Sequence, residues 1–96
     1  MDFSFTSELW LHEGPGGWHF VTLPSDVSEA IRTVTEPSRR GFGSVRVGVT
    51  IGATRWNTSI FPEATGSYAL PVKKQVRAAE HLATGDEVNV RIELLD

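Results

Sequence analysis

One stretch constrains the fold of this chain more than any other, the segment 68–90, which reads YALPVKKQVRAAEHLATGDEVNV. A short apolar run ends at a proline, whose fixed φ angle suits the first turn of a helix. The spacing predicts a strand over 68–70, a helix from Pro71 to about His81, and a turn at Gly85-Asp86 into a second strand. A strand, a helix and a strand therefore follow one another with almost no connecting residues.

The first half of this segment has a shorter echo 47 residues upstream, where Leu23-Pro24 occupies the place of Leu70-Pro71. The echo also leads into a predicted helix, because Ser25 is a good capping residue and apolar residues recur at helical spacing after it. Two interpretations stay open, an internal duplication that gives two similar halves, or a chance match of two residue pairs.

The other apolar residues alternate with polar ones, and this period of two predicts strands. The clearest runs are Phe3 to Leu11, Val45 to Ile51 and Val88 to Leu94. Glycine-containing turns join return strands over 18–23 and 56–61. The order is strand-strand-helix-strand-strand-strand-helix-strand, which predicts a mainly β domain spanning residues 1–96. Six short strands with two short helices suit a small closed or pseudo-closed barrel.

Composition excludes several classes of function. The chain has no cysteine, which rules out disulfides and thiolate chemistry and fits a cytoplasmic protein. The first ten residues lack the basic and apolar regions of a signal peptide, and no run of 18 apolar residues predicts a membrane helix. The net charge of −3 argues against a nucleic-acid partner. The charge is uneven, however: residues 32–77 hold eight bases and two acids, which leaves room for a local anion site.

Five motifs resemble the bacterial domain-of-unknown-function family numbered 1905, and they cover nearly the whole chain. The motifs are Phe3-x-Phe5-x-x-Glu8, Gly17-Trp18-x-Phe20-Val21-x-Leu23-Pro24, residues 40–45 (RGFGSV), Trp56-x-Thr58-Ser59-x-Phe61-Pro62, and Tyr68-x-Leu70-Pro71-Val72-Lys73-Lys74-x-Val76-Arg77. The resemblance implies a double-split β-barrel, and it implies no established activity. The segment from Leu70 to Val88 is also similar to the AbrB/MazE type of swapped hairpin, whose members bind DNA or act as antitoxins.

The start of the second predicted helix is the best candidate for a site. Lys73 and Lys74 lie where the helix dipole disfavours cations, and Arg77 lies one turn further on. Residues that break a local rule are concentrated at functional sites. Free N–H groups and two lysines would suit an anion. The alternative is that both lysines are solvated surface residues, partly paired with acids such as Glu80.

Four further residues complete the predicted site. Arg40 and Phe42, between glycines, could supply a facing loop with a cation and a ring, and Trp18 and Tyr68 an apolar wall. The alternative for Phe42 is a core residue in a tight turn. Trp10 falls on the polar side of its strand, which indicates that this face is partly covered, whereas Trp56 falls on the apolar side and is expected in the core.

No residue pattern points to catalysis, a cofactor or a metal. His12 and His19 flank a glycine-rich turn, but two histidines and one acid do not make a metal site, and no nucleophile motif is present. We therefore expect a small binding module for an anionic or aromatic small molecule or a protein partner. The alternatives are a DNA-binding or antitoxin-like module, by analogy of fold, and an unrecognised enzyme. The sequence leaves the oligomeric state open.

Overall fold

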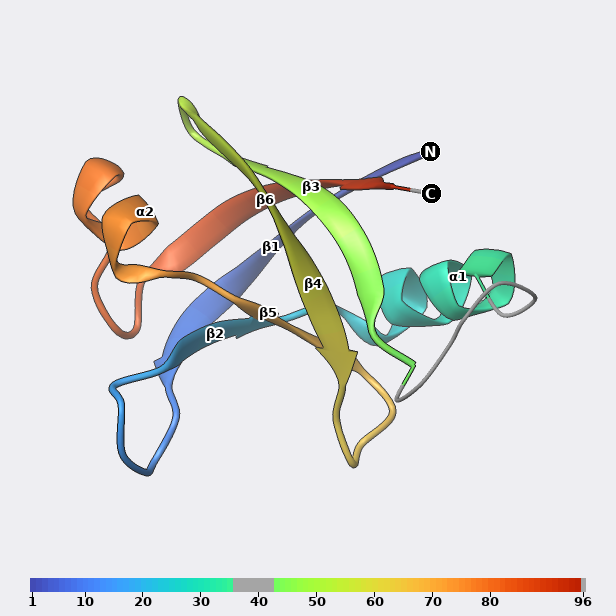
Figure 1. The fold of residues 1–96 in the computed structure, drawn as a ribbon, viewed down its shortest axis with the longest axis horizontal. Helices are drawn as coiled ribbons and strands as arrows, with labels where there is room; N and C mark the ends of the chain where they lie inside the picture. Colours follow the sequence, from blue (N-terminus) through green and yellow to red (C-terminus); the bar gives the residue numbers. More distant parts are fainter. Residues whose placement is uncertain (36–42, 96) are drawn as a thin grey trace.

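The computed structural model describes residues 1–35 and 43–95, and it confirms the predicted fold class and element order. Six antiparallel strands form a closed barrel, and two short helices flank it on opposite sides (Figure 1). The elements are β1 (Asp2–Leu11), β2 (His19–Thr22), α1 (Ser25–Thr35), β3 (Val45–Ile51), β4 (Thr54–Pro62), β5 (Tyr68–Pro71), α2 (Lys74–Ala79) and β6 (Glu87–Leu94). No helix in the described ranges is long and apolar enough to cross a membrane.

The order of strands around the barrel has twofold symmetry. The circuit is β1-β2-β5-β4-β3-β6, and it is unchanged when the first half of the chain, β1-β2-α1-β3, is exchanged with the second, β4-β5-α2-β6. The two echo segments pair directly with each other, and Thr22 faces Ala69, which lies 47 residues later. The echo therefore corresponds to equivalent places in the fold, while its origin by duplication stays a prediction.

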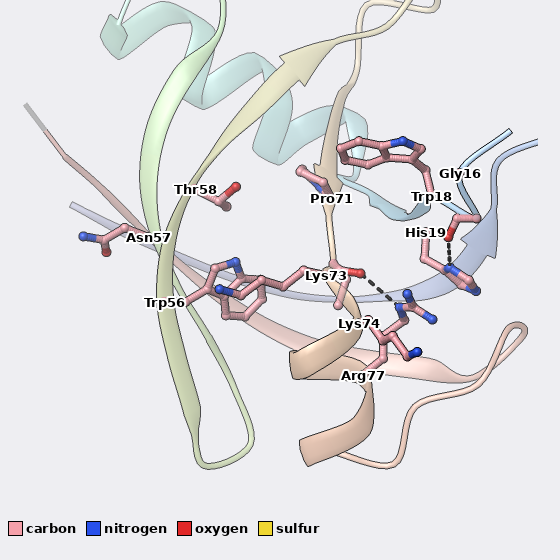
Figure 2. A pocket seen from close by; sticks show the side chains of 12 residues that line it. Gly16, Trp18, His19, Trp56, Asn57, Thr58, Pro71, Lys73, Lys74 and Arg77 are labelled. Atoms are coloured by element: carbon pink, nitrogen blue, oxygen red, sulfur yellow. Dashed lines mark hydrogen bonds between the residues drawn. The ribbon is translucent and has the colours of Figure 1, made fainter.

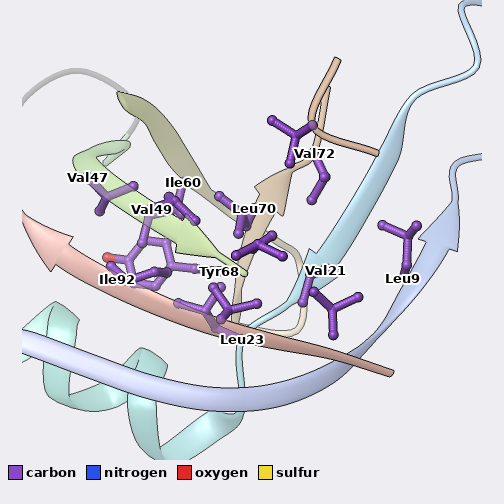
Figure 3. Packing of buried hydrophobic residues seen from close by; sticks show 14 of the residues in the cluster. Leu9, Val21, Leu23, Val47, Val49, Ile60, Tyr68, Leu70, Val72 and Ile92 are labelled. Carbon is purple, nitrogen blue, oxygen red and sulfur yellow. The ribbon is translucent and has the colours of Figure 1, made fainter. Parts of the chain in front are cut away.

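The core fills the barrel with aliphatic side chains from every second position of the strands (Figure 3). Each strand has a neighbour on both sides, although β1 pairs with β2 only over Leu9–Leu11 and β4 with β5 only over Phe61–Pro62. The period of two decides which residues of each strand point inward. The fully buried side chains include Leu9, Val21, Ile60, Leu70 and Ile92. Each helix adds apolar side chains to this core, Ile31 from α1 and Val76 from α2.

Helix α1 is joined to the barrel by a buried serine. Ser28 is 1% exposed, and its hydroxyl group accepts a hydrogen bond from the backbone N–H of Tyr68 (3.1 Å) and lies 3.4 Å from the carbonyl oxygen of Leu23, to which it donates. This hydroxyl therefore links the end of β2 to the start of β5. Arg32, one turn further along α1, donates to the carbonyl oxygen of Gly66 and lies over the Tyr68 ring.

Helix α2 is shorter than the sequence predicts. It begins at Lys74 rather than Pro71, because Pro71 still pairs with Phe20 in the sheet and the N–H of Val72 donates to the carbonyl oxygen of His19 (2.9 Å). These contacts keep the backbone extended for two residues beyond the expected start. The helix ends at Ala79, and the left-handed conformation of His81 (φ 56°) turns the chain away.

We predict that Ser28→Ala lowers the free energy of unfolding by about 1–3 kcal/mol, because it removes the buried hydroxyl that bonds to the N–H of Tyr68 and to the carbonyl oxygen of Leu23. Urea unfolding followed by tryptophan fluorescence measures this change. Ser4→Ala, at an exposed position of β1, is the matched control and is expected to change stability by less than about 0.5 kcal/mol. Equal effects of the two substitutions would show that Ser28 does not join α1 to the barrel.

Candidate functional site

A pocket of about 350 Å³ lies where α2 meets the barrel, and we call it the basic pocket (Figure 2). Three separate parts of the chain form it: the loop before β2, the middle of β4, and the segment from the end of β5 into α2. Its lining residues are Gly16, Gly17, Trp18, His19, Trp56, Asn57, Thr58, Pro71, Val72, Lys73, Lys74 and Arg77.

The fold brings together four of the seven residues predicted for the site. Trp18, Lys73, Lys74 and Arg77 all line the basic pocket, although Trp18 lies more than fifty residues from the others in the sequence. Arg40 and Phe42 lie outside the described residues. The prediction that Tyr68 forms part of the pocket wall is wrong, because this residue is 0% exposed in the barrel core. Its strand position points inward, toward the α1 side of the molecule.

Both lysines are exposed, and neither ammonium group has a hydrogen bond or ion pair to any described residue. The alternative that they pair with Glu80 does not match the structure, since the Glu80 carboxylate accepts a hydrogen bond from the hydroxyl of Thr54 (2.6 Å). Lys73 occupies the N-cap of α2 without capping it, and the first turn contains no acid. Both ammonium groups are therefore available to a ligand, at a place where they do not favour the helix.

Arg77 is held more firmly than the lysines. It is half-buried, and its Nε–H donates to the carbonyl oxygen of Val72 (3.1 Å) at the entrance to the helix. The dashed line that ends at Arg77 in Figure 2 marks this bond. It fixes the plane of the guanidinium group and leaves the terminal nitrogens without a partner among the described residues. A planar cation with free donors on one edge suits a carboxylate or phosphate.

Two tryptophans supply the apolar surface of the pocket. Trp18 is 56% exposed, and its indole lies close to the backbone of Gly16, where a Cβ atom would come within 3.0 Å of the ring. Gly16 also has a φ angle of 97°, so both the turn and the ring position require glycine there. Trp56, expected in the core, is only partly buried and lines the pocket. The Trp56 side chain lies on the inward face of β4, but near the end of the barrel that α2 covers.

The arginines on the opposite wall of the barrel differ from this group because they already have partners. Arg55 on β4 pairs with Glu93 on β6 across the intervening β3 (2.9 Å), and Arg91 on β6 pairs with Asp2 on the neighbouring β1 (2.5 Å). The hydrogen bond from Arg91 lowers the pKa of Asp2, and the same bond raises the pKa of Arg91. An anion would have to displace a carboxylate there, whereas it would meet unpaired cations in the basic pocket.

The comparison with family models matches residues 5–92 to a family described as a domain of unknown function, DUF1905. The chain belongs to this family. A comparison with curated proteins found no match. The family therefore agrees with the resemblance seen in the sequence and adds no activity to it.

His12 and His19 of this DUF1905 domain line different pockets. His19 lines the basic pocket, where its Nδ1 lies 2.8 Å from the carbonyl oxygen of Gly17. His12 packs edge-on against Phe20, on the other side of Trp18. No group of three histidine or acidic side chains suited to a metal occurs in residues 1–35 and 43–95.

We predict that Lys73→Asp stabilises the DUF1905 domain by about 1 kcal/mol, because aspartate caps a helix and suits the N-terminal end of its dipole. The backbone at Lys73 is already extended (φ −69°, ψ 160°), as an N-cap requires. Arg46→Asp makes the same change of charge on an exposed strand position and controls for net charge. A lower urea midpoint for Lys73→Asp than for Arg46→Asp would show that this lysine has a structural role.

Proposed function

We propose that this protein is a small binding domain of the bacterial cytoplasm, without catalysis of its own, whose basic pocket binds an organic anion with a flat apolar body. An aryl carboxylate is the simplest ligand of this class. The observation that supports the proposal is the meeting of unpaired cations and partly exposed indoles in one cavity. The absence of cysteine is in keeping with a reducing compartment.

The two halves of such a ligand match the two kinds of lining. The carboxylate would accept charge-assisted hydrogen bonds from Arg77 and from one or both lysines. The ring would cover Trp18 or Trp56, where contact between flat aromatic surfaces is favourable. A volume of about 350 Å³ falls at the small end of the range for ligand sites, so the ligand is a small molecule with one or two rings.

Binding of DNA, the alternative suggested by fold analogy, has weaker support. Three neighbouring cations could contact phosphates, but the domain as a whole carries −3, and the acid Glu80 directly follows α2. We predict no shift of a duplex DNA in a gel at low salt and micromolar protein, where phosphate contacts are strongest. A shift that disappears with increasing salt would favour the DNA-binding alternative.

The ligand proposal is tested with 2-naphthoate and its uncharged amide. We predict that naphthoate binds with a dissociation constant on the order of 0.1 mM, and that the amide binds about tenfold more weakly because it lacks the charge. Amide chemical shifts in NMR spectra should move at residues 16–18 and 73–77. Calorimetry gives the affinities.

The double variant Lys73→Ala/Lys74→Ala should weaken naphthoate binding about tenfold while leaving the melting temperature unchanged or higher, since neither lysine has a partner to lose. Arg46→Ala removes an exposed cation outside the pocket and is expected to bind normally. Equal affinity for naphthoate and naphthamide, or unaltered binding by the lysine variant, would contradict the proposal.

A further inference from the structure

The outer surface of the barrel is apolar on one wall only. Where β2 and β5 meet the adjoining ends of β1 and β4, the outward positions carry Trp10, Phe20, Pro71 and Phe61. We call these four residues together with Trp18 the aromatic face. On β3, β6 and the rest of β4, the outward positions are polar or charged, among them Arg46, Arg55, Arg91 and Glu93. A sheet face that looks toward water is normally polar, so the aromatic face indicates a contact surface.

The strand register lines up these groups. Trp10 pairs with Phe20, and Phe20 pairs with Pro71, so three flat apolar side chains follow one another straight across three strands. The Trp18 ring stacks on the Phe20 ring at 6.1 Å between centroids and 14° between planes. Phe61, 47% exposed, borders the other side of a hollow of about 420 Å³ formed over this row.

We infer that the aromatic face binds an extended, proline-containing peptide segment with an acidic residue beside its prolines. Strand addition is not available to such a peptide on the aromatic face, because the strand segments there already pair with one another: Trp10 with Phe20, Phe20 with Pro71, and Ala69 with Phe61. A polyproline II segment needs no edge: its backbone groups make no internal hydrogen bonds, and its rings pack on aromatic grooves. The indole N–H of Trp10 donates to the Thr22 hydroxyl (2.9 Å), whereas that of Trp18 has no acceptor among the described residues and can donate to a peptide carbonyl group.

Charge complementarity determines where the acidic residue lies. The hollow on the aromatic face and the basic pocket share Trp18 and Pro71, so a segment that crosses Trp18 leaves the apolar rings and meets Lys73 and Lys74. The far rim carries Glu63, which the Thr22 hydroxyl approaches at 3.4 Å, and an acidic residue is disfavoured there. The inferred position of the acidic residue rests on the proposed function of the basic pocket, whereas the inferred contacts of the prolines do not.

The test uses two peptides of about twelve residues with proline at every third position, the period of the polyproline II helix. One peptide ends in glutamates and the other in glutamines. Their affinities for the whole domain are measured by calorimetry, with naphthoate measured in parallel. Phe61→Ser removes a ring that does not line the basic pocket, and Val34→Ser removes an equally exposed apolar side chain on α1 as the matched control.

We expect Phe61→Ser to weaken the binding of both peptides at least about fivefold and to leave the affinity for naphthoate unaffected. Val34→Ser should change neither affinity. The lysine variant should lower the affinity of the glutamate peptide to that of the glutamine peptide. If the peptides bind through Phe61 but naphthoate does not bind, the result would support peptide binding at the aromatic face and contradict the ligand proposed for the basic pocket.

Three results would overturn the inference. The first is no binding of either peptide at about 1 mM, a concentration at which even a weak groove would be half occupied. The second is peptide binding that Phe61→Ser does not change. The third is a dimer in solution that Phe61→Ser converts to a monomer, which would show that a second copy of this chain covers the face.

Discussion

Closure of the barrel is the constraint on which the rest of this structure depends. The two shortest strands, β2 and β5, complete the circuit by pairing with each other, and each ends at or just before a Leu-Pro step that leads toward a helix. Once the circuit is closed, each strand has one face inside and one outside, and no register shift of a single residue is possible without exchanging them. The same pairing that buries Val21 and Leu70 therefore places Phe20 and Pro71 outside.

The position of the basic pocket follows from this closure. Because Pro71 stays in the sheet and Val72 continues its hydrogen bonding, α2 cannot begin before Lys74. The delay places the lysines and Arg77 beside the loop that carries Trp18, rather than along the side of a longer helix. Two bonds to the barrel side then fix the helix, from Arg77 to Val72 and from Thr54 to Glu80. A six-residue helix is too short to be stable alone, so these contacts and the burial of Val76 hold it.

The sequence predicted the barrel because the alternation of apolar and polar residues in strands, and the prolines that end them, are local signals. The alternation in Val45 to Ile51 and the Leu-Pro steps needed no knowledge of the rest of the chain. The start of α2 was placed too early because the partner of Pro71 in the sheet, Phe20, is fifty-one residues away and leaves no local mark. Tyr68 and Trp56 were misplaced for a related reason. The alternation predicts whether a side chain points into or out of the barrel. Its depth along the barrel axis decides whether an inward side chain is buried or borders a pocket.

The residues that break local rules are the ones that the fold collects in one region. Lysines begin a helix that has no acid or cap, a tryptophan rests on a glycine turn, and Trp10 and Phe61 point outward where polar groups are usual. Each would lower the solubility or stability of an isolated barrel slightly, and the opposite wall shows that this fold accepts polar residues at such positions. Their concentration on both sides of Trp18 is not required by the barrel itself, and it is the observation from which both proposed binding surfaces are argued.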